Sequence, residues 1–149
     1  MVEKLIREYL AEKRMMQIAS VNGDKPWICT VYFVADEHQN LYWLSLPKRR
    51  HSQEIKKNNK VAIAIPVKFD KPVIGIQTEG VAEVVADSEV VKVVMEKYVE
   101  KYGQGKDFYD NFVAGKMEHS LYKFTPKRFA LFDEVHFSTG DPQEWIFDK

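Results

Sequence analysis

The sequence predicts a mainly β protein with flanking helices, whose antiparallel strands form a closed or partly closed barrel. Three observations lead to this fold class. About six or seven segments rich in Val, Ile, Thr and aromatic residues have the composition of strands. Short turns join most of them as hairpins, and only a few segments have helical periodicity. Short strands with such connections favour a barrel. The 149 residues are expected to form one domain, residues 1–149.

The first half of the chain is predicted to contain one helix, three strands and a second, shorter helix. Apolar residues at helical spacing predict a helix from Val2 to about Lys13. The expected strands are Met15 to Val21, Trp27 to Ala35 and Leu41 to Ser45. The first two are joined by a hairpin turn at Asn22-Gly23-Asp24. The basic turn Lys48 to His51 then leads into the short helix, which we expect to start at Ser52.

The second half is predicted to complete the sheet and to add two helices. Its expected strands are Val61 to Val67, Val73 to Ala86, Leu121 to Thr125 and Arg128 to Asp133. Gly80 interrupts the second of these strands, which suggests a bulge or a close approach by another backbone or a ligand. The last two strands are expected to be broken or bulged at Pro126. The helices are expected at about Glu89 to Tyr102, capped by Asp87 or Ser88, and at Asp107 to Ala114.

The composition argues against a charged macromolecular partner. Lys plus Arg is 22 and Asp plus Glu is 22, so the formal net charge is zero and any basic site must be local. The single cysteine, Cys29, excludes an internal disulfide and fits a reducing compartment. No apolar run in the sequence approaches the length of a membrane span, and residues 1–13 are too charged for a signal peptide. We therefore expect a soluble cytoplasmic protein.

The sequence lacks the usual motifs of metal-dependent and hydrolytic chemistry. The four histidines are scattered without the spacing of paired metal ligands, so no metal site is expected. There is no Gly-x-Ser-x-Gly motif for a nucleophilic serine. The segment Gly103-Gln-Gly105-Lys106 follows a helix and is better read as a helix C-cap than as a phosphate loop. If the protein is an enzyme, we expect a bound cofactor to supply the reactivity.

The basic turn collects hydroxyl, guanidinium and imidazole groups where a helix begins. Ser45 ends the preceding strand, the turn contributes Lys48 to His51, and Ser52 can cap the helix. Helix N-termini attract anions, and arginine can hold two phosphate oxygens at once, so the pattern predicts a phosphate-sized site. Two alternatives are a merely solvated loop and a site for single-stranded nucleic acid. The zero net charge and the nearby Glu54 argue against nucleic acid.

Several short motifs, in order along nearly the whole chain, resemble the FMN-binding split-barrel proteins. That superfamily includes pyridoxamine 5′-phosphate oxidase, and the chain is most similar to small, poorly characterised members of it. Two of the motifs are Leu41-Tyr-Trp-Leu-Ser and Arg50-His-Ser-Gln-Glu-Ile. The full set of matching segments is residues 16–27, 41–45, 50–61, 76–83 and 122–129. The resemblance implies an antiparallel split β-barrel.

The resemblance also implies a homodimer with FMN at the subunit interface, and it suggests which residues bind the cofactor. The isoalloxazine ring is expected along the strand from Cys29 to Val34, held largely by backbone groups, with the phosphate at the basic turn. The implied FMN-binding residues are Thr30, Val31, Tyr32, Ser45, Arg50, His51, Ser52 and Gln77. Arg49 stands where the family usually has a small residue, so its role stays open. Trp145 could cover the flavin or pack at the dimer interface.

The function expected from this resemblance is that of an FMN-binding flavoprotein, an FMN-dependent oxidoreductase with an unassigned substrate. The C-terminal Arg and His pattern that holds substrate in true pyridoxamine phosphate oxidases is not found, and no catalytic residue is identified. The alternative is a split-barrel module that binds haem or a deazaflavin, or that has no catalytic role.

Overall fold

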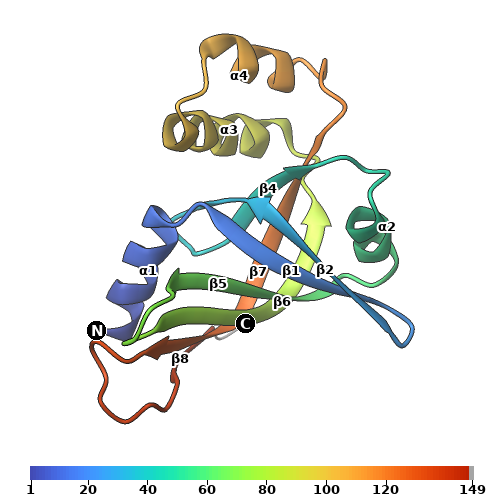
Figure 1. Cartoon of the computed structure of the whole chain (residues 1–149). Coiled ribbons are helices and arrows are strands. Elements are labelled where there is room, and N and C mark those ends of the chain that lie inside the picture. The colour runs from blue at the N-terminus through green and yellow to red at the C-terminus, as the bar shows by residue number, and fades with distance from the viewer. Residues whose placement is uncertain (148–149) are drawn as a thin grey trace.

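The computed structural model describes residues 1–147, which form eight strands and four helices (Figure 1). The strands are β1 (Met15–Asn22), β2 (Lys25–Tyr32), β3 (Val34–Ala35), β4 (Leu41–Ser45), β5 (Lys60–Lys68), β6 (Ile74–Val84), β7 (Ser120–Asp133) and β8 (Gln143–Ile146). The helices are α1 (Val2–Glu12), α2 (Arg50–Lys57), α3 (Ser88–Tyr102) and α4 (Lys106–Val113). None of the described helices is both long and apolar enough to cross a membrane.

All eight strands belong to one antiparallel sheet that curls into a partial barrel, which confirms the predicted fold class. The strand order is β2-β1-β5-β6-β7-β4-β3, and β8 pairs with β7. β2 and β3 are consecutive in the chain but stand at opposite ends of this order. Only Phe33 separates them, so the sheet must bend round until its two ends meet. Because β2 pairs with β1 alone among the described strands, its other edge stays open.

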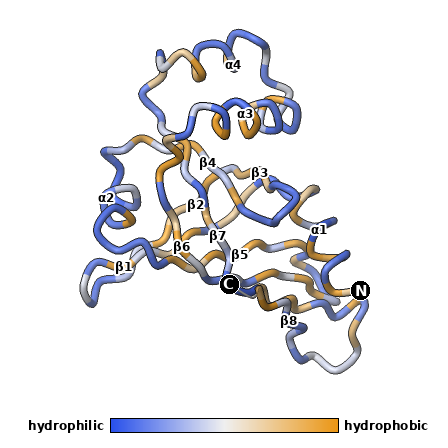
Figure 2. Tube along the Cα trace, turned by 180° about the vertical axis from the view of Figure 1, so that it is seen from behind, coloured by the Kyte–Doolittle hydropathy of each residue, from blue (hydrophilic) through white to orange (hydrophobic). Residues whose placement is uncertain are grey.

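The main core fills the inside of the curled sheet. In β1 and β5 the buried residues alternate with less buried ones, as expected of strands with one face in a core. The largest side chains buried there are aromatic, namely Phe33, Trp43, Phe124 and Phe129. α1 packs its apolar stripe, which includes Ile6 and Leu10, onto the same core. A second, smaller core lies beneath α3 and α4. Figure 2 shows that hydrophobic residues concentrate in the strands, whereas α2 is mostly hydrophilic.

Several predicted boundaries differ from the observed ones, and the strand β8 was not predicted. The strand expected from Trp27 to Ala35 is divided into β2 and β3, because Phe33 leaves the ladder and its N–H donates to the Arg14 carbonyl at 3.0 Å. Of the two alternatives expected at Pro126, a break or a bulge, the bulge is confirmed: β7 is one continuous strand whose register skips Lys127, since Arg128 faces Glu79 and Pro126 faces Gly80. The short helix α2 begins at Arg50, two residues earlier than expected, and its first turn therefore contains Arg50 and His51. Of the two proposed caps of α3, Asp87 is the one observed.

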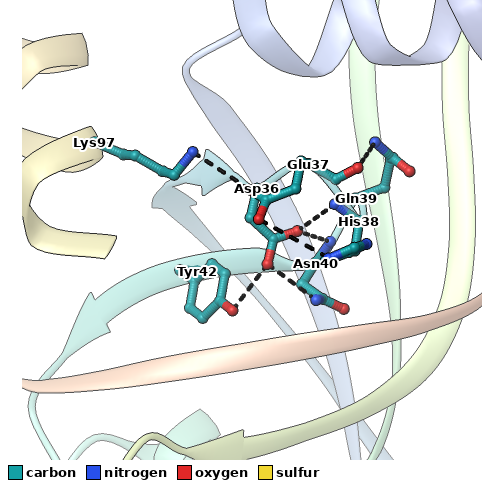
Figure 3. Close-up of polar contacts among 7 residues, drawn as sticks. All are labelled: Asp36, Glu37, His38, Gln39, Asn40, Tyr42 and Lys97. Carbon is teal, nitrogen blue, oxygen red and sulfur yellow. Dashed lines mark hydrogen bonds and ion pairs between the residues drawn. The ribbon is translucent and has the colours of Figure 1, made fainter. Parts of the chain in front are cut away.

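The turn between β3 and β4 is held by a network of polar contacts around one carboxylate (Figure 3). Asp36 accepts hydrogen bonds from the backbone N–H groups of His38 and Asn40, both at 2.9 Å. It also accepts one from the Tyr42 hydroxyl at 3.0 Å. An ion pair of 3.5 Å between Glu37 and Lys97 joins the turn to α3. These contacts fix the start of β4, the strand that leads to the basic turn.

Two neighbouring side chains of α3 hold the crossing between β2 and β3. The Lys101 ammonium donates hydrogen bonds to the carbonyls of Lys13, Phe33 and Leu10. Burial lowers the pKa of Lys101 to about 8. The Tyr102 hydroxyl donates to the Phe33 carbonyl, and the Arg14 carbonyl lies 2.9 Å from the same hydroxyl oxygen. The end of β2 is thus fixed by contacts with α3 and with the segment that joins α1 to β1.

Substitution of Gly80 tests the packing of β6 against the bulge in β7. A Cβ atom at Gly80 would collide with the Thr125 carbonyl oxygen and with the Phe124 ring, neither of which can move freely. We expect Gly80→Ala to lower the free energy of unfolding by about 3 kcal/mol, the upper range for overpacking. Urea denaturation would measure the loss. Gly75→Ala in the same strand is the control, because a Cβ there meets nothing within 4 Å. Equal stabilities of the two variants would contradict the assigned close approach.

Candidate functional site

The N-terminus of α2 has the features of an anion-binding site. Arg49 is its N-cap residue, with extended backbone angles, and no described side chain caps the helix. The first backbone bond into the helix runs from the Gln53 N–H to the Arg49 carbonyl at 3.0 Å. The N–H groups that precede Gln53 therefore have no partner within the helix. Together with the helix dipole, they favour an anion at this position.

Ser45 and His51 lie together at the buried side of this helix start. The Ser45 hydroxyl and His51 Nε2 are 2.9 Å apart, and both residues are buried. Burial, followed by the charge of Arg49, lowers the pKa of His51. His51 is therefore neutral at pH 7 and provides a hydrogen-bonding group, not a second positive charge. The structure brings these two predicted residues into direct contact.

Arg50 lies on another side of α2 and contacts the β1–β2 hairpin. Its guanidinium lies over the Trp27 ring, with Cζ 4.1 Å from the ring centroid. Its Nε donates to Glu54 Oε2 at 2.9 Å, and the arginine side chain stays 46% exposed. Glu54 Oε1 in turn accepts a hydrogen bond of 2.7 Å from the Ser20 hydroxyl. The positive charge expected at the site is therefore present, but a neighbouring carboxylate compensates it.

The contacts of Ser20, Trp27 and Glu54 were missed in the sequence analysis. The spacing of Arg50 and Glu54, four residues apart in a helix, was a signal that the two side chains could meet. No comparable signal links Trp27 to Arg50, because that contact depends on how α2 packs against the hairpin.

Ser52 does not join the other predicted anchors. Its hydroxyl is buried and has no hydrogen-bond partner among the described residues. It lines a cavity of about 430 Å³ whose walls include Ile55, Ala82 and Tyr122. Side chains two residues apart on an α-helix are rotated by about 200° about its axis. Ser52 and Arg50 therefore leave α2 in nearly opposite directions. The four residues predicted to hold a phosphate therefore share the start of α2 but do not form one cluster of side chains.

The expected ring-binding residues lie at the far end of β2, on its open edge. Val31 packs against the main core, whereas Thr30 and Tyr32 are exposed on the opposite face. The Tyr32 ring meets the Tyr102 ring edge-on, with 5.4 Å between centroids. Unpaired backbone N–H and C=O groups on such an edge can bind the polar rim of a planar ring. Thr30 is three residues from Trp27, the residue that contacts Arg50. The expected ring-binding backbone therefore lies about 10 Å along β2 from that contact.

Gln77 is not close to these residues within one chain. It is exposed on β6, opposite Ala64 on β5 and Ala130 on β7. β6 is separated from β2 by β1 and β5, which puts about 14 Å between the two strands. The side chain of Gln77 lines a shallow cavity of about 310 Å³ with several alanines of the outer sheet face. Trp145 packs within the chain, stacked on Phe147 with centroids 4.9 Å apart and beside Phe129.

The curled sheet, its open edge and the flanking helices define a protein of the split-barrel class. The family model described as pyridoxamine 5′-phosphate oxidase matches residues 2–133, so the chain belongs to that family. The curated UPF0306 protein PM1958 of Pasteurella multocida is 26% identical over 82 residues. That match spans 53% of this chain and 55% of the relative, about half the length of each.

Solved structures of low sequence identity share the fold. The conserved hypothetical protein Rv2991 of Mycobacterium tuberculosis superposes with a TM-score of 0.78 at 18% identity, over 100% of this chain and 94% of its own. HutZ, a haem storage protein of Vibrio cholerae, has a TM-score of 0.68 at 22% identity, over 88% of this chain and 93% of its own. A protein described as storing haem therefore shares this scaffold.

Proposed function

We propose that the protein is an FMN-binding flavoprotein, a homodimeric FMN-dependent oxidoreductase whose substrate is unassigned. The observation that carries the proposal is the uncapped start of α2, with Arg50 beside it, at one end of the open edge of β2. FMN, when bound, would supply electron transfer at its isoalloxazine ring.

In this proposal each end of β2 has a separate role. The α2 N–H groups and the terminal amino groups of Arg50 would bind the phosphate, with His51 and Ser45 forming the polar wall beneath it. The backbone of Thr30, Val31 and Tyr32 would bind and orient the ring. The Trp27 side chain, which covers one face of the Arg50 guanidinium, would keep water from that side of the anion.

The proposed second copy would cover the outer sheet face. Several large apolar side chains of the β1–β2 hairpin lie exposed on that face, namely Met15, Ile28 and Tyr32, whereas Trp27 stands on the other face beside Arg50. Clusters of this kind mark interaction surfaces in soluble proteins. The alanines beside Gln77 give the neighbouring strands a smooth surface against which another sheet can pack. Gln77 of the second copy would then reach the ring that β2 of the first copy binds.

Haem is the second candidate, because the similar structure HutZ is described as a haem storage protein. The absorbance spectrum of the freshly purified protein separates the two candidates. We expect a yellow, fluorescent protein, or a colourless one that turns yellow and quenches flavin fluorescence when FMN is added. A strong Soret band would favour haem instead. A colourless protein that takes up neither cofactor would contradict the proposal and favour a module without a cofactor.

Removal of the Arg50 side chain tests the phosphate end of the site. We expect Arg50→Ala to weaken FMN binding by about 1.5–3 kcal/mol, the usual contribution of a hydrogen bond to a charged group. A fluorescence titration with FMN would measure the change. Lys48→Ala is the matched control, because Lys48 lies exposed in the same turn. An FMN affinity that is equal in the two variants would exclude Arg50 as the anchor.

A charge on the outer face tests the proposed dimer. Ile28 is 59% exposed on β2, and we expect Ile28→Glu to convert the dimer to monomers by burying an unpaired charge at the interface. Sedimentation velocity would measure the mass. Val93→Glu is the control, because Val93 is 55% exposed on α3, away from the sheet face. A monomeric parent protein, or an Ile28→Glu variant that stays dimeric, would count against this interface.

A further inference from the structure

A buried carboxylate lies directly behind the proposed anion site. Glu54 is only 5% exposed, although it belongs to a short helix with a hydrophilic surface. Both of its oxygens are engaged, Oε1 by the Ser20 hydroxyl at 2.7 Å and Oε2 by Arg50 Nε at 2.9 Å. These two hydrogen bonds hold the pKa of Glu54 below its usual range, so the group is ionised at neutral pH. Burial of a charge is unfavourable unless it is paired in this way.

The contact to Glu54 uses only one part of the Arg50 guanidinium. Nε is the nitrogen nearest the backbone, and its bond to the carboxylate uses one of the five N–H donors, so it does not use those of the two terminal amino groups. The Trp27 ring supports the plane of the same group, with Cζ 4.1 Å from the ring centroid. A hydrogen bond in the plane and a ring against its face together fix the direction of a side chain that is otherwise flexible. A group fixed in this way loses less entropy when it binds a ligand.

We propose that Glu54, held by Ser20, is a positioning residue that directs the terminal amino groups of Arg50 toward the phosphate of the bound cofactor. The inference rests on the proposed function, since it takes the anion to be the FMN phosphate. It adds that discrimination between phosphorylated and unphosphorylated flavin depends on a residue that does not touch the ligand.

The negative charge of Glu54 also has an opposite effect, because it repels a phosphate. Arg50 and the expected phosphate position face solvent, with 46% of the arginine side chain exposed, so water and salt weaken this repulsion. The orientation of the guanidinium depends on short contacts and is not weakened in that way. We therefore expect the loss of orientation to outweigh the relief of repulsion when Glu54 is neutralised.

A double-mutant cycle with two flavins tests the proposal. The four proteins are the parent, Glu54→Gln, Arg50→Ala and the double variant, each titrated by fluorescence with FMN and with riboflavin, which lacks the phosphate. A glutamine is neutral, so even if its oxygen accepts from Arg50 while its amide donates to the Ser20 hydroxyl, the charge-assisted hydrogen bond that holds the guanidinium is lost. We expect Glu54→Gln to weaken FMN binding about tenfold and to change riboflavin binding less than about twofold. In the Arg50→Ala background, we expect Glu54→Gln to add less than about a further twofold.

The following outcomes would contradict the proposed positioning role of Glu54. Tighter or unchanged FMN binding by Glu54→Gln would make Glu54 a competing or a neutral charge. Equal losses for FMN and riboflavin would indicate a general structural role, and additive losses would show that Glu54 acts independently of Arg50. Failure of the proposed function would appear separately, as a parent protein that does not prefer FMN to riboflavin. If Glu54→Gln does not fold, Ser20→Ala replaces it in the same cycle, with the same expected dependence on Arg50.

A control carboxylate comes from α3. Glu89 pairs with Lys92 at 3.4 Å on an exposed helix surface, far along the chain from the anion site. We expect Glu89→Gln to leave the preference for FMN over riboflavin unchanged. A loss equal to that of Glu54→Gln would trace the effect to net charge and not to the orientation of Arg50.

Discussion

The rest of the structure depends on the crossing of the chain at Phe33. Because β2 and β3 pair at opposite ends of one sheet, the residue between them must pass through the core, where Phe33 is fully buried. A buried backbone needs partners for its polar groups. The Phe33 N–H donates a hydrogen bond to the Arg14 carbonyl, and the Phe33 carbonyl accepts hydrogen bonds from Lys101 and Tyr102 of α3. The curl of the sheet and the open edge of β2 follow from this crossing.

The local charge of the site follows from how α2 packs, not from the charge of the whole chain. The formal net charge is zero, so the molecule has no general attraction for anions. Within the site, Arg50 is paired with Glu54, and His51 is neutral because its burial lowers its pKa. Attraction for a phosphate thus comes from short-range groups, the N–H groups of α2 and the outer nitrogens of Arg50. Such a site selects by geometry, which suits a single bound cofactor better than a long nucleic-acid strand.

The parts of the fold that local patterns determine were predicted well. β4 has the expected bounds, Leu41–Ser45, and Gly80 marks a close approach of backbone, as its place in a strand suggested. The division of the strand at Phe33 was not predicted, because residues 27–35 have the composition of a strand throughout. Only the pairing of β2 and β3 with different strands interrupts the ladder there. In the candidate site, Ser45 and His51 meet as neighbours of one helix start. Gln77 and β2 are separated by two strands, an arrangement that depends on strand order and leaves no trace in local sequence.

Membership of the family does not decide the cofactor, since a protein described as storing haem shares this scaffold. The anion site alone does not decide it either, because a helix N-terminus with an arginine suits a carboxylate as well as a phosphate. The edge of β2 is more selective. Its unpaired N–H and C=O groups match the N–H and C=O groups along the rim of an isoalloxazine ring, whereas the polar groups on the rim of a haem are confined to its two propionates. The one buried histidine of the site, His51, has its Nε2 beside the Ser45 hydroxyl, which makes that nitrogen a poor ligand for iron. Both arguments favour a flavin.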